Sequence, residues 1–146
     1  MAGPTSVLFA CTQNAIRSAM AESILKHVAG SRIFVDSVGV RPGELDPFAV
    51  AVMKEIGIDL ARHRPKGFDD LEDDNFDMVI SLSPEAQHRA VEMTRTTACE
   101  LEFWNTFDPT AIEGNRDTRM AAFRQVRDWL LARIRERFGD AAARVP

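Results

Sequence analysis

Residues 6–18 read SVLFACTQNAIRS, an apolar run followed directly by a polar loop and the start of a new pattern. The run from Val7 to Ala10 is short and continuously apolar, which is typical of a strand buried on both faces. Over residues 17–29, apolar side chains recur every four positions, which indicates a helix with one apolar face. The side chains in question are Met20, Ile24 and Val28. The stretch therefore predicts a buried strand, a tight polar loop and an amphipathic helix.

The rest of the chain repeats this alternation of short apolar runs and helical patterns. Asp46-Pro47 and Ser83-Pro84 each combine a helix-capping residue with a first-turn proline, so each predicts the start of a helix. The expected strands are residues 33–38, 78–82 and 101–104, and the expected helices are residues 46–56, 83–93 and 117–138. The last helix carries an apolar stripe along its whole length.

Strands that alternate with helices predict a parallel sheet covered by helices on both faces. Right-handed crossovers limit the topology further. We expect one α/β domain over residues 1–146, with four parallel strands in the order 2-1-3-4. Ligands of such sheets bind at the carboxyl ends of the strands, so the loops at residues 11–18 and 105–114 become the candidates for a functional site.

Composition excludes several classes of protein. The net charge of −4 argues against a nucleic-acid partner, which requires a basic surface. No apolar run approaches the roughly 18 residues that a membrane-spanning helix needs. Two cysteines do not make a disulfide framework, so the reducing cytoplasm is the expected compartment.

The first loop combines Cys11 at the strand end with Arg17 at the helix start. Loop N–H groups and a helix N-terminus bind anions, and an arginine adds a two-pronged donor for phosphate-like oxygens. The same positive surroundings favour a nucleophilic thiolate at Cys11, to which Ser18 is able to donate a hydrogen bond. An inert buried cysteine is the simpler interpretation of Cys11 alone, but it accounts for neither Arg17 nor Ser18. The expected substrate-binding residues are Thr12, Gln13, Asn14, Ala15, Ile16 and Ser18.

The chain resembles the low-molecular-weight protein tyrosine phosphatases and the related thioredoxin-coupled arsenate reductases. Two motifs carry the resemblance in combination: the loop Cys11-x5-Arg17-Ser18, and the pair Asp108-Pro109 about a hundred residues later. Further similar segments are Ala21-Glu22, Asp36-Ser37-Val38-Gly39, Asp46-Pro47, Gly57-Ile58-Asp59, His63-Arg64 and Phe76-Asp77. The resemblance implies that Asp108 is a general acid and that His63 supports Asn14.

The position of Asp108 in the predicted fold also favours a catalytic role. It follows the fourth expected strand and therefore lies at the same edge of the sheet as Cys11, where a carboxylic acid would protonate a leaving oxygen. Taken alone, Asp-Pro is a common turn. The aromatic residues around it, Phe103, Trp104 and Phe107, are expected either to form a wall of the cleft or to belong to the core. Arg41, near the expected mouth, is able to meet an anionic substrate, but a solvated surface side chain is the favoured interpretation.

Three positions depart from the family pattern. Gln13 stands where the phosphatases usually carry glycine, Ile16 where many relatives carry a second cysteine, and Thr110 where an aromatic residue often follows Asp-Pro. With Ile16 in place, no disulfide forms beside Cys11 to protect it from oxidation. These differences concern substrate preference and not the expected fold.

The reductases also need a resolving thiol, and the sequence offers none in the expected place. Ser83 and Ala90 occupy the positions of the reductases' cysteine pair. Cys99 precedes the fourth strand, about 15 Å from the edge that holds Cys11, whereas a disulfide needs Cα atoms within about 7 Å. It therefore reads as a small buried apolar residue.

Phosphomonoester hydrolysis through a phosphocysteine ranks first among the readings, with a phosphorylated protein or a small phosphomonoester as substrate. Arsenate reduction with an external thiol such as glutathione or thioredoxin is the alternative, and a non-catalytic oxyanion- or phosphopeptide-binding module is a third. None of these requires a metal ion or other cofactor. The acidic run at residues 69–74 lacks His or Cys at ligand spacing and is interpreted as solvated.

Overall fold

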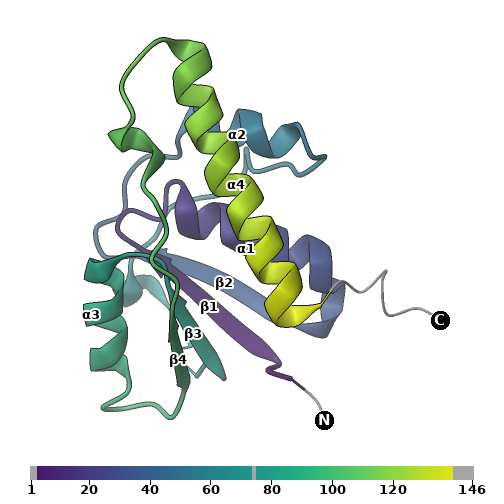
Figure 1. Cartoon of the computed structure of the whole chain (residues 1–146). Helices are drawn as coiled ribbons and strands as arrows, with labels where there is room; N and C mark the ends of the chain where they lie inside the picture. Colours follow the sequence, from purple (N-terminus) through teal and green to yellow (C-terminus); the bar gives the residue numbers. More distant parts are fainter. Residues whose placement is uncertain (1–2, 74, 140–146) are drawn as a thin grey trace, which may run out of the picture.

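A parallel sheet of four strands in the order β2-β1-β3-β4 forms the centre of the molecule (Figure 1). The computed structural model describes residues 3–73 and 75–139. The strands are β1 (Ser6–Cys11), β2 (Phe34–Gly39), β3 (Met78–Ser81) and β4 (Glu100–Phe103). Every neighbouring pair is parallel, so the predicted sheet and its strand order are confirmed, with strand boundaries shifted by at most one residue.

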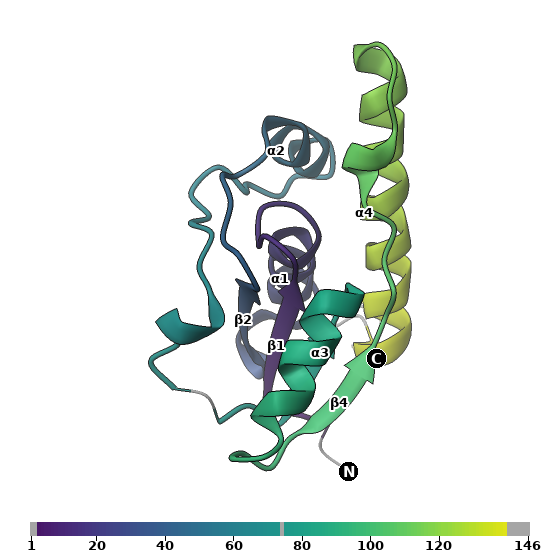
Figure 2. The ribbon, with the colours of Figure 1, turned by 90° about the vertical axis from the view of Figure 1, so that its left-hand side faces the viewer.

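Helices cover both faces of this sheet, as predicted (Figures 1 and 2). They are α1 (Arg17–Ala29), α2 (Pro47–Lys54), α3 (Pro84–Met93) and α4 (Arg116–Phe138). Helices α1 and α4 lie on one face and α3 lies on the other (Figure 2). Helix α2 ends before the predicted Ile56, because the chain turns there and Gly57 adopts a φ of 79°. In the described part of the chain, no helix is both long and apolar enough to cross a membrane.

The alternation of side chains along β1 divides the core into two layers. Val7, Phe9 and Cys11 pack with the residues of α1 and α4. Leu8 and Ala10 belong to the smaller cluster that includes α3. Cys11 is thus the last β1 side chain on the α1 side, and it lies at the carboxyl edge of the sheet. The strand therefore delivers the cysteine to the point where helix α1 begins.

An ion-paired carboxylate joins the end of α2 to the middle of α4. Glu55 accepts hydrogen bonds from Arg124 Nη2 at 2.8 Å and from Arg127 Nη1 at 2.7 Å. The hydrogen bond from Arg124 is the largest cause, and that from Arg127 the second, of a pKa that falls from 4.5 to about 2. The folded protein therefore holds the Glu55 carboxylate in its charged form more firmly than the unfolded chain does.

We expect this link to contribute to stability above pH 4.5 and to be lost as the pH falls towards about 2. Glu55→Gln removes that contribution and flattens the acid limb of the stability curve. Urea unfolding at neutral pH and across the acid range measures the difference, with the exposed Glu113→Gln as the matched control. An acid limb that is equally steep in both variants and in the parent protein would contradict the assignment.

Candidate active site

The loop between β1 and α1 is shaped by two backbone requirements. Asn14 adopts a φ of 57°, a left-handed conformation that asparagine tolerates better than most side chains. Beneath it, a Cβ atom on Gly39 would lie 2.6 Å from the backbone of Gln13 and Asn14. Glycine at position 39 therefore allows β2 to pass close under the loop, and the loop folds tightly over the sheet edge.

Cys11 lies under this loop and is only 1% exposed. Its Sγ lies 2.9 Å from Ser18 Oγ, and it accepts hydrogen bonds from the backbone N–H groups of Asn14 at 3.3 Å and Ser18 at 3.4 Å. The sulfur is therefore held in place by polar groups of the loop and of the first turn of α1.

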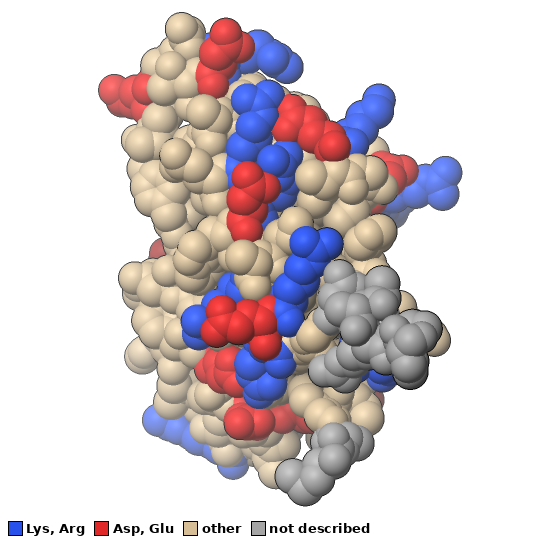
Figure 3. Space-filling view, turned by 45° about the vertical axis from the view of Figure 1, so that its right-hand side comes forward, with Lys and Arg blue, Asp and Glu red and all other residues tan. Residues whose placement is uncertain are grey.

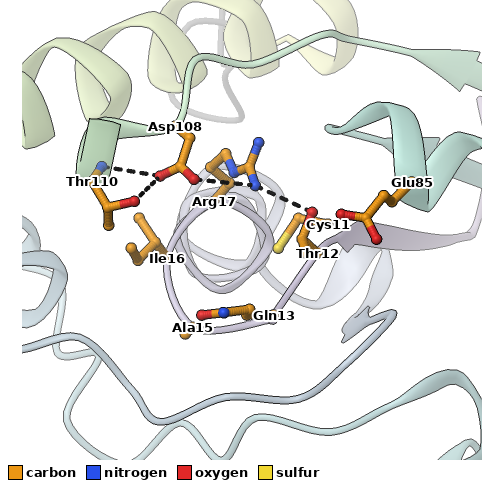
Figure 4. A pocket seen from close by; sticks show the side chains of 9 residues that line it. All are labelled: Cys11, Thr12, Gln13, Ala15, Ile16, Arg17, Glu85, Asp108 and Thr110. Atoms are coloured by element: carbon orange, nitrogen blue, oxygen red, sulfur yellow. Dashed lines mark hydrogen bonds and ion pairs between the residues drawn. The ribbon is translucent and has the colours of Figure 1, made fainter. Parts of the chain in front are cut away.

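The loop encloses one side of a cavity of about 190 Å³ (Figure 4). Its lining residues are Cys11, Thr12, Gln13, Ala15, Ile16, Arg17, Glu85, Asp108 and Thr110. Ile16 is the N-cap of α1 and supplies no side-chain hydrogen bond to the first turn. The first turn of α1 therefore has no side-chain cap, and the positive end of the helix lies at the cavity, which is a usual element of an anion site.

Arg17 is held across this cavity by polar contacts at both ends of its guanidinium group. Nη1 donates to the carbonyl oxygen of Thr106 at 3.1 Å, and Nη2 lies 3.5 Å from Thr12 Oγ1. The side chain is only 11% exposed. Cys11 and Arg17 thus face the same small space (Figure 4), which is the convergence expected from the sequence.

Asp108 stands at the mouth of the cavity, and its two oxygens have different surroundings. Oδ1 accepts hydrogen bonds from the backbone N–H of Thr110 at 3.0 Å and from its hydroxyl at 2.7 Å. Oδ2 lies 4.0 Å from Arg17 Nη2. One oxygen therefore fixes the carboxyl group at the start of the short helix Pro109–Ala111, while the other faces the guanidinium. The side chain is 48% exposed, so it is open to a ligand.

Asn14 and Ser18 do not line the cavity, in contrast to the expectation that they bind substrate. Both are fully buried behind the loop. Asn14 Nδ2 donates to Ser18 Oγ and to Ser37 Oγ, each at 2.8 Å. The physical reason is the left-handed turn at Asn14, which directs the amide inwards. These two residues support the loop from beneath.

His63 reaches the same asparagine from the other side. Its Nε2 lies 3.0 Å from the Asn14 carbonyl oxygen and 3.1 Å from Asn14 Oδ1, which also accepts from the Lys66 backbone N–H at 3.0 Å. The supporting position expected for His63 is the one observed. Sequence reasoning missed the next member, Glu22, whose carboxylate contacts Ser37 and lies 3.9 Å from His63 Nδ1. Its spacing of four from Ser18 on α1 is the signal that was available.

We expect Asn14→Ala to lower the free energy of unfolding by about 3 kcal/mol, because it leaves several buried polar groups without partners. The loop loses its support as well, so the affinity for inorganic phosphate falls. Urea unfolding and phosphate titration by calorimetry measure the two effects. The exposed Asn105→Ala serves as the control, for which we expect a change within about 0.5 kcal/mol. An Asn14→Ala protein that is as stable as the Asn105→Ala control would contradict the supporting role of Asn14.

Of the two predicted roles for the aromatic residues around Asp108, Trp104 has the core role, and none of the three residues lines the cavity. Trp104 is buried in the core and packs edge-on against Phe9, with ring centroids 6.1 Å apart. Phe103 and Phe107 are exposed, and neither lines the cavity. The side chains of β4 and the following loop alternate in direction, which turns these rings away from the mouth. Ile16 and Thr110 contribute to the lining instead.

The rim opposite Asp108 carries an ion pair that the sequence did not reveal. Arg41 Nη1 donates to Glu85 Oε2 at 2.5 Å, and Nη2 donates to Oε1 at 3.2 Å. Arg41 is exposed as expected, but it is paired and not merely solvated. Glu85 lies in the first turn of α3 and lines the cavity. The position of Glu85 shortly after β3, at the carboxyl edge of the sheet, is the signal that the sequence contains.

The two cysteines lie far apart in the fold. Cys11 ends β1 at the carboxyl edge and packs on the α1 side. Cys99 directly precedes β4 at the amino edge and packs in the α3-side cluster. Both are free thiols. Ser83, at the position of a resolving cysteine in the reductases, places its hydroxyl 3.1 Å from Thr12 Oγ1.

No metal centre is found among the residues that the structure describes, where no three His, Cys, Asp or Glu side chains are grouped to hold an ion. The first two residues of the acidic run, Asp69 and Asp70, belong to the short 3-10 helix Phe68–Asp70. Position 74 of that run lies outside the described residues.

A strand ending in cysteine, an anion-binding loop and a helix opening with arginine define a class of proteins in which a thiol meets a tetrahedral oxyanion. The profile of the family described as "Low molecular weight phosphotyrosine protein phosphatase" matches residues 6–141. The chain therefore belongs to this family, whose members are cysteine-based enzymes, and the resemblance found from the sequence is confirmed.

Similar proteins carry the names of both activities in this family. An arsenate reductase of Bacillus subtilis is 34% identical over 89% of this chain and 92% of its own length. One from Bacillus licheniformis is 35% identical over 92% and 95%. A solved arsenate reductase in its oxidized state has a TM-score of 0.76 at 28% identity, covering 90% of this chain and 95% of the other. An Erwinia amylovora tyrosine phosphatase shares the fold, with a TM-score of 0.70 at 20% identity and 92% and 91% coverage.

Proposed function

We propose that the protein is an arsenate reductase in which Cys11 is the nucleophile and an external thiol takes up the arsenic. The observation that carries this proposal is the position of the Cys11 sulfur beneath a small cavity that Arg17 faces from its side. The names of the similar proteins favour arsenate over a phosphomonoester, which reverses the ranking drawn from the sequence. The site suits the cytoplasm, where a thiol stays reduced.

In the first step, the Cys11 thiolate attacks arsenic and forms an S–As bond. One As–O bond breaks, and its oxygen leaves as water after taking a proton from Asp108. Arg17 and the positive N-terminal end of α1 stabilise the remaining oxygens as charge shifts between them. The product is an arsenic(V) adduct on Cys11, and no electron has yet been transferred.

In the second step, the external thiol attacks arsenic and not the cysteine sulfur. The inner side of Cys11 Sγ is occupied by Asn14 N and by the backbone N and Oγ of Ser18, so a second sulfur has no path to it from behind. From the cavity side, the thiol gives its proton to Asp108 and forms a new S–As bond. The bond from arsenic to Cys11 breaks, and its electron pair returns the cysteine to a thiolate.

Reduction follows on the released adduct. A second thiol molecule attacks the sulfur of that adduct and forms a disulfide. The electron pair of the S–As bond stays on arsenic, which passes from arsenic(V) to arsenite while two thiols are oxidised. The protein therefore needs no resolving cysteine, which agrees with its two cysteines and their separation in the fold.

The test is an assay with arsenate and either glutathione or thioredoxin, followed by mass spectrometry of the protein. We expect arsenite to form and Cys11 to remain free of glutathione. Cys99→Ser is the matched control and should leave the rate unchanged. No arsenite with either reductant would overturn the reductase, and glutathione attached to Cys11 during turnover would contradict attack on arsenic.

Phosphomonoester hydrolysis is the second candidate, and the position of Asp108 beside Arg17 favours it. The same cavity would accept a phosphoryl group from a phosphorylated protein or a small phosphomonoester. Cys11 would form a phosphocysteine, Asp108 would protonate the leaving oxygen, and water activated by Asp108 would release phosphate. A non-catalytic oxyanion- or phosphopeptide-binding module, the third reading, requires Asp108 to be idle.

Asp108→Asn separates these readings. If Asp108 is the general acid, hydrolysis falls by about 10²- to 10⁴-fold. The loss should be larger for phenyl phosphate than for 4-nitrophenyl phosphate, because phenolate is the poorer leaving group. Steady-state rates with both esters measure it, and the exposed Asp69→Asn is the control. Unchanged hydrolysis would remove the acid role, while a parent protein that binds phosphate but hydrolyses neither ester would favour the binding module.

A further inference from the structure

The cavity has a carboxylate on two sides of its mouth. Asp108 follows β4, whereas Glu85 comes from the first turn of α3 (Figure 4). Both line the cavity that Cys11 and Arg17 share. The oxygens of a bound anion have Arg17 and the start of α1 as their partners, so the carboxylates face whatever stands above the anion.

We propose that Glu85 is a specificity-determining residue, whose carboxylate favours a cationic group and opposes an anionic group above the bound oxyanion. This position is occupied by the organic group of a phosphomonoester or by the thiol that attacks arsenic. The inference rests on the oxyanion site of the proposed function, but not on which of the two reactions takes place there.

Glu85 is well placed for this role because of its position in α3. It lies in the first turn of the helix, where the positive end stabilises a negative charge. Ser83 caps that turn by accepting a hydrogen bond from the Ala86 backbone N–H at 3.2 Å. The backbone that carries Glu85 is therefore fixed beside the cavity, which its side chain helps to line.

Arg41 determines how strongly the Glu85 carboxylate acts on a ligand. It pairs with Glu85 from the loop after β2, but it does not itself line the cavity. A ligand in the cavity consequently meets the carboxylate before the guanidinium. The two side chains are 64% and 50% exposed, and an exposed pair of this kind holds its geometry weakly. A cationic ligand group is thus able to share the carboxylate with Arg41.

Figure 3 shows one face of the molecule, on which Lys and Arg are interspersed with Asp and Glu. Glu85 differs because its carboxylate borders a cavity in which Cys11 and Arg17 define the position of the anion.

Three phosphonates of similar size test the proposal without requiring turnover. 2-Aminoethylphosphonate carries a cation, 2-carboxyethylphosphonate an anion, and propylphosphonate neither, and binding is measured by calorimetry at a pH where all three phosphonate groups are dianions. We expect the amino compound to bind about three- to five-fold more tightly than propylphosphonate, and the carboxy compound more weakly by a similar factor.

Three substitutions test whether Glu85 causes this difference in affinity between the phosphonates. Glu85→Gln should remove most of it, and Arg41→Gln should enlarge it, because the carboxylate then loses its partner. Glu92→Gln, the same change at the far end of α3, should leave it unaltered. Equal binding of the three phosphonates, or an unaltered preference in Glu85→Gln, would overturn the proposal. Failure to bind even inorganic phosphate would instead reject the oxyanion site itself, and the inference with it.

Discussion

Cys11→Ser is expected to reduce turnover of arsenate or of an aryl phosphate by a factor on the order of 10⁶. The serine hydroxyl stays protonated at neutral pH and is a poor nucleophile without a neighbouring base. The groups that contact the Cys11 sulfur, from Asn14 and Ser18, supply no such base. The loop and the helix N-terminus remain, so the affinity for inorganic phosphate should change little.

Rates and phosphate binding are measured on the same protein preparation, so that loss of chemistry is separated from loss of the site. Cys99→Ser is the matched control, because it makes the same atomic change at the other cysteine. Turnover that survives in Cys11→Ser would show that position 11 does not supply the nucleophile. Loss of phosphate binding as well would show that the sulfur shapes the loop.

Arg17→Lys is expected to reduce turnover by about 10²- to 10³-fold and to weaken phosphate binding. The guanidinium spans the distance between the Thr106 carbonyl and Thr12 while it also faces the cavity. A lysine ammonium presents one charged point and does not reproduce two parallel donors. The positive charge is kept, so the experiment isolates the geometry of the donor.

Arg32→Lys, an exposed arginine beyond the end of α1, is the control for this substitution. Steady-state kinetics and calorimetric titration with phosphate are compared for both variants. A lysine at position 17 that supports the parent rate would mean that any positive charge suffices there. The paired donors of Arg17 would then have no part in the chemistry.

Most strands and helices could be predicted because the local sequence patterns agree with the general rules of parallel sheets along this chain. The apolar run Val7–Ala10 indicates a strand without knowledge of any partner. The carboxyl ends of parallel strands share one edge, so Cys11 and Asp108 were expected at the same place although they are far apart in sequence. The capping pairs Asp46-Pro47 and Ser83-Pro84 both begin helices, as the Asp46 and Ser83 side chains show.

The remaining features depend on side-chain direction, which a linear pattern does not contain. Trp104 follows β4 by one residue and enters the core, whereas Phe107 is exposed. The contact between Glu85, in the first turn of α3, and Arg41, in the loop after β2, leaves no periodic signal. Asn14 also leaves no periodic signal, because its side chain is directed inward by the left-handed backbone conformation of Asn14 itself. The directions of these side chains depend on burial and on backbone angles in the folded chain.

Alkylation of the two cysteines by iodoacetamide, with and without inorganic phosphate, tests the central claim most directly. If the anion occupies the space shared by Cys11 and Arg17, phosphate slows alkylation of Cys11 in a saturable way and leaves Cys99 unaffected. The protection should weaken in Arg17→Lys. Mass spectrometry of the two peptides from one sample gives both rates. Alkylation of Cys11 that proceeds equally fast at every phosphate concentration would contradict the account.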